Sequence, residues 1–468
     1  MRSTLKGTIL GATVAGLLLA PQMAAATSVE EQLQAMQDRM AQMEEQLQAT
    51  HDDLQSANER VESQAGIIRE AGLEDDRSAS SGLSSFLSDT EFYGWVNASY
   101  TLNTHMDGGS GSIDFQNIGN GLPSTVAGSH PQNMSFSVNQ VWIGMDNAAT
   151  ADSRAGFHVD LMFGSDANDP HLQGFGCGSE VNNFGGFNSA TNNICVFTAN
   201  VSYLAPIGPN GVNFTMGKMA TLLGAEVVET PWNFNITRGL VWGIQPVTNI
   251  GLVTSADLGS GFSLALGVID NPIGIQDPDD NKAKSFTGQL AWSNDNYGVS
   301  LGGNWGDTGV GAFNNSGEAS ILDLVLSADP TDNLSLWLNF DWVYGEDGAS
   351  FTGNQGDTTD TYGLAVAGRY AITDDTGIAL RGEWVRQDND QSGANADGTT
   401  DQWSITTTVD HNLTDNLMLR GEFRYDEANC TDGAGCTSNP TNANYLDGNG
   451  NARYRDQFLF LVDLTYEF

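Results

Sequence analysis

Basic residues are scarce in this sequence. The chain of 468 residues contains 18 Lys and Arg against 58 Asp and Glu, for a formal net charge of -40. Nucleic acid is therefore excluded as a general partner, because its binding requires clustered basic side chains. The acidic excess concentrates in segments rich in Asp, Asn and Gly, such as 277–281 and 388–390, which is typical of solvated, mutually repelling loops. Two alternatives stay open: divalent cations bridging these loops to anionic lipid head groups, and a Ca²⁺ site at 447–451.

Long apolar runs are absent after the first 26 residues. The start carries Arg2 and Lys6, followed by an apolar run at 9–20 and a small-residue cleavage pattern at 24–26, which together indicate a secretory signal peptide over 1–26. The run is shorter than the roughly 18 apolar residues that a transmembrane helix needs. A long exported chain without such helices can still enter a membrane as a β-barrel.

The four cysteines form two pairs that are close in sequence. Cys177 and Cys195 lie in one polar segment rich in Gly and Asn, and Cys430 and Cys436 lie in another. In an exported protein such pairs indicate two disulfides that staple loops. Metal binding is the alternative, but neither pair has CxxC spacing or a clustered histidine.

Histidine is scarce as well, which bears on catalysis. Of the six histidines, His158 alone shares a predicted strand face with a carboxylate, Asp160, and the pattern places no serine nucleophile beside them. We therefore predict that the chain is not an enzyme, holds no metal and uses no cofactor.

Residues 27–71 have a helical pattern. Apolar or small residues recur there in alternating steps of four and three, beginning at Val29 and Leu33, and glutamates and glutamines cover the other faces. Six heptads in register predict a coiled coil, and hence an oligomer, with a lone amphipathic helix as the alternative. The serine-rich segment 72–89 predicts a linker.

From residue 90 onward, apolar and polar side chains alternate in segments of about ten residues, which is typical of membrane strands with one lipid face and one lumen face. In one such segment, Leu336 and Trp342 alternate with Asn339 and Asp341. We predict sixteen strands, near 90–102, 134–146, 154–164, 196–205, 212–219, 248–257, 261–270, 284–293, 297–306, 319–329, 333–344, 360–371, 376–387, 401–412, 416–426 and 456–468.

The connections between these strands alternate strictly between short and long. The short ones, from 147–153 to 413–415, are expected to be periplasmic turns, and the long ones, from 103–133 to 427–455, extracellular loops. A miscount by one strand would break this alternation. The expected fold class is therefore all-β: a 16-stranded antiparallel transmembrane β-barrel at 90–468 in the outer membrane of a Gram-negative bacterium, with an N-terminal α-helical coiled coil in the periplasm.

Two parts of the chain resemble a known family. The last strand, 457–468, ends on Phe468 with aromatic and aliphatic residues at alternate positions, which is similar to the C-terminal strand of outer-membrane barrels. The segment MGKMATLLGAE at 216–226, followed by 233–235 and 238–240, resembles the beta-barrel porin-2 (OmpL-like) group of porins. A coiled coil ahead of a sixteen-stranded barrel resembles the DcaP-type trimeric porins. The resemblance implies a homotrimer and a third loop that enters the lumen.

The third long connection, 220–247, is too apolar to remain in water, since it contains two tryptophans and several leucines and valines. We predict that it folds down into the lumen as a pore constriction whose charged residues are Glu226, Glu229 and Arg238. The alternative is that it packs over the barrel rim or against a neighbouring subunit.

Strand parity turns Arg369, Arg381, Arg420 and Arg424 toward the lumen as part of the pore wall. Acidic residues on a loop that faces these arginines would create a transverse field, which favours polar solutes and, if the arginines face the permeation path, anions. The alternative is that the arginines only pair with wall glutamates across the strands.

The sequence thus predicts an outer-membrane porin, a passive diffusion channel for small hydrophilic solutes with anions as one candidate class. Its expected partners are outer-membrane lipid, lipopolysaccharide and further copies of the chain in a homotrimer. The alternative function is a structural or adhesive protein whose coiled coil links the envelope, with peptidoglycan as a candidate partner.

Overall fold

The computed structural model describes residues 88–103, 135–168, 177, 194–272, 284–307, 317–346, 358–390, 398–431 and 456–468. The predicted signal peptide, the coiled coil, most of the linker, Cys436 and the segment 447–451 lie outside these residues. The strands are β1 (Glu91–Asn103), β2 (Ser135–Asn147), β3 (Ala155–Phe163), β4 (Ile194–Ala205), β5 (Val212–Ala220), β6 (Thr248–Gly259), β7 (Phe262–Ile269), β8 (Ser285–Ser293), β9 (Tyr297–Asp307), β10 (Glu318–Thr331), β11 (Leu334–Glu346), β12 (Thr358–Ala371), β13 (Thr376–Asp390), β14 (Gly398–Thr414), β15 (Leu417–Thr431) and β16 (Asp456–Glu467).

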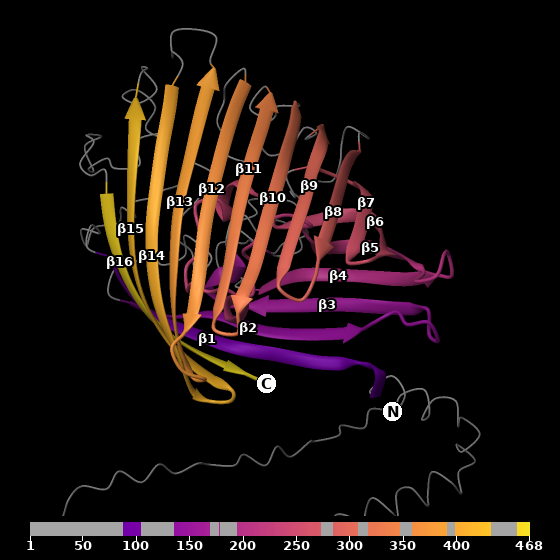
Figure 1. The fold of residues 1–468 in the computed structure, drawn as a ribbon, viewed down its shortest axis with the longest axis horizontal. Helices are drawn as coiled ribbons and strands as arrows, with labels where there is room; N and C mark the ends of the chain where they lie inside the picture. Colours follow the sequence, from indigo (N-terminus) through magenta and orange to yellow (C-terminus); the bar gives the residue numbers. More distant parts are fainter. Residues whose placement is uncertain are drawn as a thin grey trace, which may run out of the picture. The chain divides into compact units, whose positions relative to one another are not determined.

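These strands form one closed antiparallel barrel. Each strand pairs with its neighbours in sequence, and β1 closes the barrel by pairing with β16 as well as with β2. Figure 1 shows β8 to β16 side by side, with the last strand ending near β1. The prediction of an all-β barrel of sixteen strands is confirmed. Several strands extend beyond their predicted ends, for example β14, which was expected at 401–412.

Alternate side chains separate the two faces of each strand, as the pleat of an extended backbone requires. In β16, Phe460, Val462 and Leu464 are 43–50% exposed on the outside, whereas Leu461 and Asp463 are at most 4% exposed on the inside. The outer surface is thus apolar and suited to lipid, and the inner surface carries the polar residues.

The two ends of the barrel differ in their connections. Short connections join β2 to β3, β4 to β5 and each later pair up to β14 and β15, and we call this the turn end. In one of them, between β6 and β7, Ser260 and Gly261 both have positive φ, the combination of a type I′ hairpin turn. Bacterial barrels place such turns in the periplasm. Among the described residues, no helix is both long and apolar enough to cross a membrane.

The connection between β5 and β6, residues 221–247, lies inside the barrel, and we call it loop L3. Loop L3 contains two short 3₁₀ helices, η4 (Thr230–Trp232) and η5 (Trp242–Ile244). Another short 3₁₀ helix, η2 (Ser165–Asn168), lies outside this loop and follows β3. The apolar core of the barrel is where L3 touches the wall. One cluster joins Leu223, Leu240, Val241 and Ile244 of the loop to Ile321, Val343, Ala365 and Val385 of β10 to β13.

Candidate functional site

Loop L3 reaches from the strands where it begins to the opposite wall. The backbone N–H of Ala225 donates to Asn339 Oδ1 of β11 at 3.1 Å, and that of Ile236 donates to Glu422 Oε2 of β15 at 2.6 Å. Buried backbone groups need such partners, and inward side chains of the wall supply them here because the loop has no strand neighbour. The loop therefore crosses the lumen rather than covering the rim.

Arg238 organises the loop from within. Its side chain is fully buried, and its guanidinium donates to the carbonyl oxygens of Val227 (2.5 Å), Val228 (2.5 Å) and Ile236 (2.9 Å). Burial lowers the pKa of Arg238 to about 10, which leaves the group protonated at neutral pH. Arg238, predicted as a charged residue of the constriction, is thus an internal brace of L3: its guanidinium holds three carbonyl groups of the loop together.

The two acidic residues predicted for the constriction are also covered. Glu226 accepts a hydrogen bond from the backbone N–H of Gly239 at 2.7 Å and forms an ion pair with Arg381 of β13. Glu229 is 9% exposed. Burial raises the pKa of Glu229 to about 7, with a further contribution from the charge of Asp160. Glu229 therefore titrates near neutral pH.

Three wall arginines hold L3 from the side opposite β5 and β6. We call Arg381 of β13 with Arg420 and Arg424 of β15 the arginine anchor. All three are at most 1% exposed. Each donates through Nη1 to a loop carbonyl: Arg381 to Thr237 (2.7 Å), Arg420 to Thr230 (3.1 Å) and Arg424 to Arg238 (2.6 Å).

Each arginine of this anchor also has an acidic partner. A buried charge is tolerated where it is paired and hydrogen-bonded, and leaving one partner alone costs several kcal/mol. The pairs are Arg381 with Glu226 and, at 2.9 Å, Glu383; Arg420 with Asp463 at 2.5 Å; and Arg424 with Asp426 at 2.7 Å. The anchor is thus a set of neutralised ion pairs.

The structure differs from the interpretation in which all four predicted arginines line an open water path. They point into the lumen, but L3 covers Arg381, Arg420 and Arg424. Arg369 alone keeps a partly exposed side chain, at 33%, and pairs with Asp410 at 2.6 Å. Arg381 combines the two alternatives left open by the sequence, because it meets both a loop glutamate and a wall glutamate.

A second anchor was not predicted as a site, and it contains no arginine. Asp323 of β10 and Asp341 of β11 are direct cross-strand partners, and both are 0% exposed. Asn339 Nδ2 donates to Asp323 at 2.7 Å, and Gln245 of L3 donates to Asp341 at 2.6 Å and to Asn339 Oδ1 at 2.9 Å. We call Asp323, Asn339, Asp341 and Gln245 the carboxylate anchor. Strand parity placed Asn339 and Asp341 inward, but their contact with Gln245 had no sequence signal.

A polar cluster surrounds Asp160 on the inner wall of β1 to β4. Its carboxylate accepts hydrogen bonds from Tyr93 Oη (2.7 Å), Trp142 Nε1 (2.9 Å) and Thr198 Oγ1 (2.8 Å), and lies 2.7 Å from His158 Nε2. The face shared by His158 and Asp160, noted in the sequence, thus becomes a direct contact. Four partners on four strands fix the position of this carboxylate.

Cys177 and Cys195 are joined by a disulfide, and both are fully buried. Lys218 of β5 lies against this bridge and donates to the carbonyl oxygen of Val196 at 3.1 Å. For the second predicted pair, Cys436 lies outside the described residues, so that disulfide stays a prediction. In the described part of the chain, no three His, Cys, Asp or Glu side chains are grouped so that they could hold a metal ion.

Comparisons with known proteins agree with this architecture. Residues 89–468 match the family described as beta-barrel porin-2, OmpL-like. No curated protein matches the sequence.

Solved structures share the fold at low sequence identity. The trimer form of OmpT, an outer membrane protein of Vibrio cholerae, is similar with a TM-score of 0.50 and 13% identity, over 81% of this chain and 99% of that chain. OmpT lacking loop L8 has a TM-score of 0.50 and 12% identity, over 81% and 99%. The outer membrane channel DcaP of Acinetobacter baumannii has a TM-score of 0.48 and 10% identity, over 81% and 97%. Because the family match spans the whole barrel, the chain belongs to the beta-barrel porin-2 (OmpL-like) family, passive diffusion channels of the bacterial outer membrane.

Proposed function

We propose that this porin conducts small hydrophilic solutes along a path whose width loop L3 limits. A sixteen-stranded barrel is wide enough for an aqueous channel unless something occupies its lumen. The supporting observation is the position of L3, which is bonded to the wall at both anchors and buries Ile236, Arg238 and Ile244 to 0% exposure. The loop is therefore the element that sets the size limit for solutes.

The contacts of the arginine anchor argue against a filter for anions made of wall arginines. Arg381, Arg420 and Arg424 each face a carboxylate and a loop carbonyl, so their charge is largely compensated inside the protein. Among the four predicted arginines of the pore wall, only Arg369 offers a partly exposed guanidinium. We expect weak ion selectivity, with no dependence on the three buried arginines as long as L3 stays in place.

Recording from purified protein in a planar lipid bilayer tests this function. We expect stepwise current increments, and we expect poly(ethylene glycol)s to be excluded at a smaller size than an unobstructed lumen of sixteen strands would allow. The absence of current steps would contradict the channel, and a size limit equal to that of the unobstructed lumen would contradict the role of L3. In a salt gradient, Arg369→Gln is expected to shift the reversal potential slightly toward cations.

We further propose a homotrimer whose subunits are joined in the periplasm by a coiled coil over 27–71 and whose apolar outer surface contacts outer-membrane lipid and lipopolysaccharide. The heptad pattern of the sequence and the trimer form recorded for OmpT of Vibrio cholerae support the proposal. Cross-linking of the mature chain with and without 27–71 tests it. A monomer in both forms would contradict the trimer, and equal trimer yields would contradict the role of the coiled coil.

A further inference from the structure

A cavity of about 360 Å³ lies at the turn end, where the short helix η4 of L3 meets the inner wall. Its lining includes Trp232 of the loop and Tyr93 and Trp95 of β1. Its lining also includes the carboxylates Glu91 and Glu467, from the two strands that close the barrel. The cavity thus combines aromatic faces with negative charge.

Trp232 is held in place although it is exposed. Its side chain is 58% exposed, and its ring lies 5.7 Å from that of Trp95, which stacks on Trp142 at 4.7 Å. A large aromatic side chain on a buried loop leaves apolar surface in water unless a ligand covers it. The stacked rings behind Trp232 reduce the freedom that it would lose on binding.

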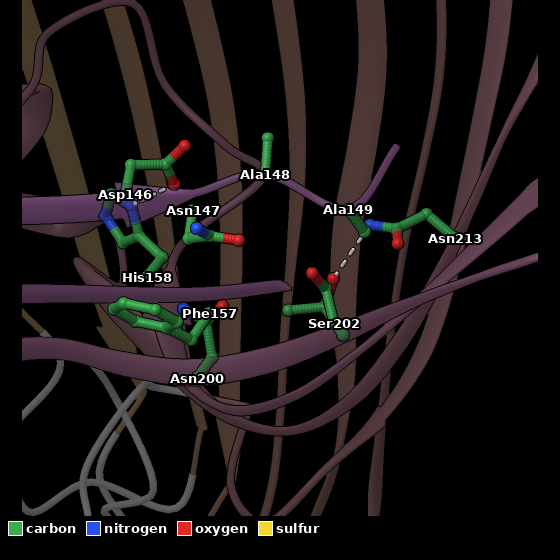
Figure 2. A pocket seen from close by; sticks show the side chains of 10 residues that line it. Asp146, Asn147, Ala148, Ala149, Phe157, His158, Asn200, Ser202 and Asn213 are labelled. Carbon is green, nitrogen blue, oxygen red and sulfur yellow. Dashed lines mark hydrogen bonds and ion pairs between the residues drawn. The ribbon is translucent and has the colours of Figure 1, made fainter. Parts of the chain in front are cut away.

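A second cavity, of about 260 Å³, adjoins the first, and Asp146 and His158 line both. Figure 2 shows these two residues at one side of the smaller cavity and Ser202 and Asn213 at the other. In the described part of the chain, the buried Oδ1 of Asn213 has no hydrogen-bond partner. Leaving such an acceptor without a donor costs free energy.

The charge that the two cavities present is negative. Glu91, Asp146 and Glu467 line them, and Asp160 lies behind. The basic side chain in the lining is His158, whose ring nitrogens lie 2.9 Å from Asp146 and 2.7 Å from Asp160. Where His158 is protonated, Asp146 and Asp160 share its single positive charge, so the lining keeps a net negative charge through Glu91 and Glu467.

We propose that the two cavities form a docking site for an organic cation, a solute in which an ammonium or guanidinium group is attached to an aromatic or apolar part. The cationic group would lie between Asp146 and the ring of Trp232, since an aromatic face attracts a cation within about 6 Å of its centre. The inference rests on the proposed channel function, because the lumen brings solutes to the site. The docking site would make organic cations a preferred solute class at the periplasmic end of the channel.

Isothermal titration calorimetry on the folded protein in detergent tests the site. The probes are benzyltrimethylammonium, neutral benzyl alcohol and anionic benzoate, which share the aromatic ring and differ in charge. We expect the cation alone to bind, and Asp146→Asn and Trp232→Ala each to weaken its binding by about tenfold. Trp232→Phe is expected to retain part of the affinity. The matched control is Asp374→Asn, which removes an exposed carboxylate from the turn between β12 and β13.

Each result decides the matter. Equal binding of the three probes, no binding of the cation, or equal weakening by Asp374→Asn would overturn the site, the last because it would show general attraction to an acidic surface. Current steps recorded from the same preparations report the channel and the folding of each variant separately. A protein that conducts without binding the cation would therefore refute the docking site and leave the channel intact.

Discussion

Loop L3 is tied to the barrel wall by two anchors of opposite chemistry. In the arginine anchor, Arg381, Arg420 and Arg424 each meet a carboxylate within the protein. In the carboxylate anchor, Asp323 and Asp341 face each other across β10 and β11, and their hydrogen-bond donors are amides. In the arginine anchor, each guanidinium attracts an ionised carboxylate near neutral pH. In the carboxylate anchor, the two buried carboxylates repel each other when both are ionised. The arginine side is therefore expected to carry most of the stability of L3.

The largest effect is expected from Arg381→Ala, which tests the arginine side directly. The change leaves Glu226 and Glu383 buried beside each other without their cation, so we expect a loss of about 3–5 kcal/mol in the free energy of unfolding. The freed loop should also give larger current steps in the planar bilayer. Urea unfolding followed by tryptophan fluorescence measures the stability.

Arg386→Ala is the matched control, because Arg386 lies on the same strand but its side chain is 42% exposed in its pair with Asp388. Exposed ion pairs contribute little, so we expect an unchanged urea midpoint and unchanged conductance. If Arg381→Ala behaves like this control, the arginine anchor does not hold the loop.

An intermediate effect is expected from Glu229→Gln. Glu229 is a buried carboxyl group within the loop, and its change tests what the burial of this group costs. Burial raises its pKa to about 7, whereas an unfolded chain loses this proton near pH 4.3. Between these values the folded state keeps a proton that the unfolded state has lost, so stability decreases as the pH rises. We expect the free energy of unfolding of Glu229→Gln to equal that of the wild type at pH 4 and to be higher by up to about 3 kcal/mol at pH 8. Urea midpoints at both pH values measure this, and a constant difference would contradict it.

The smallest effect is expected from Asp341→Asn, which removes the repulsion between the two carboxylates of the carboxylate anchor. The amide keeps an acceptor for Gln245 and supplies an N–H for the buried Oδ1 of Asp323, which has no partner in the described part of the chain. We expect a gain of roughly 1–2 kcal/mol at pH 8 in urea unfolding. Asp332→Asn, in the exposed turn between β10 and β11, is the control. A loss of stability would show that the two carboxyl groups together stabilise the loop and would remove the contrast between the anchors.

Prediction from the sequence succeeded where a residue's role follows from its own strand. Alternation of side chains is a local property, so Asn339 and Asp341 could be assigned to the inner face, and Phe460 and Val462 to the outer face, without knowing any partner. The length of the connections supported the strand count in the same way. The apolar composition of 220–247 indicated that the loop packs, since such residues avoid water.

Prediction failed where a role depends on which residues meet. Arg238 reads as a pore charge in the sequence, but it is an internal brace because the loop closes around it. Arg424 is turned inward by parity, yet parity cannot show that the carbonyl of Arg238 covers it at 2.6 Å. Gln245 and Asp341 are 96 residues apart, and no period in the sequence relates them.

By itself, the sequence determined the barrel, its strand number and its two faces, because a period of two and the lengths of connections are written along the chain and need no tertiary contact. Only the tertiary structure decided what the lumen contains. Whether an inward arginine faces water or a loop carbonyl depends on the path of a loop that begins more than a hundred residues away in the chain, and burial of that loop changes the energy of every charge that it covers.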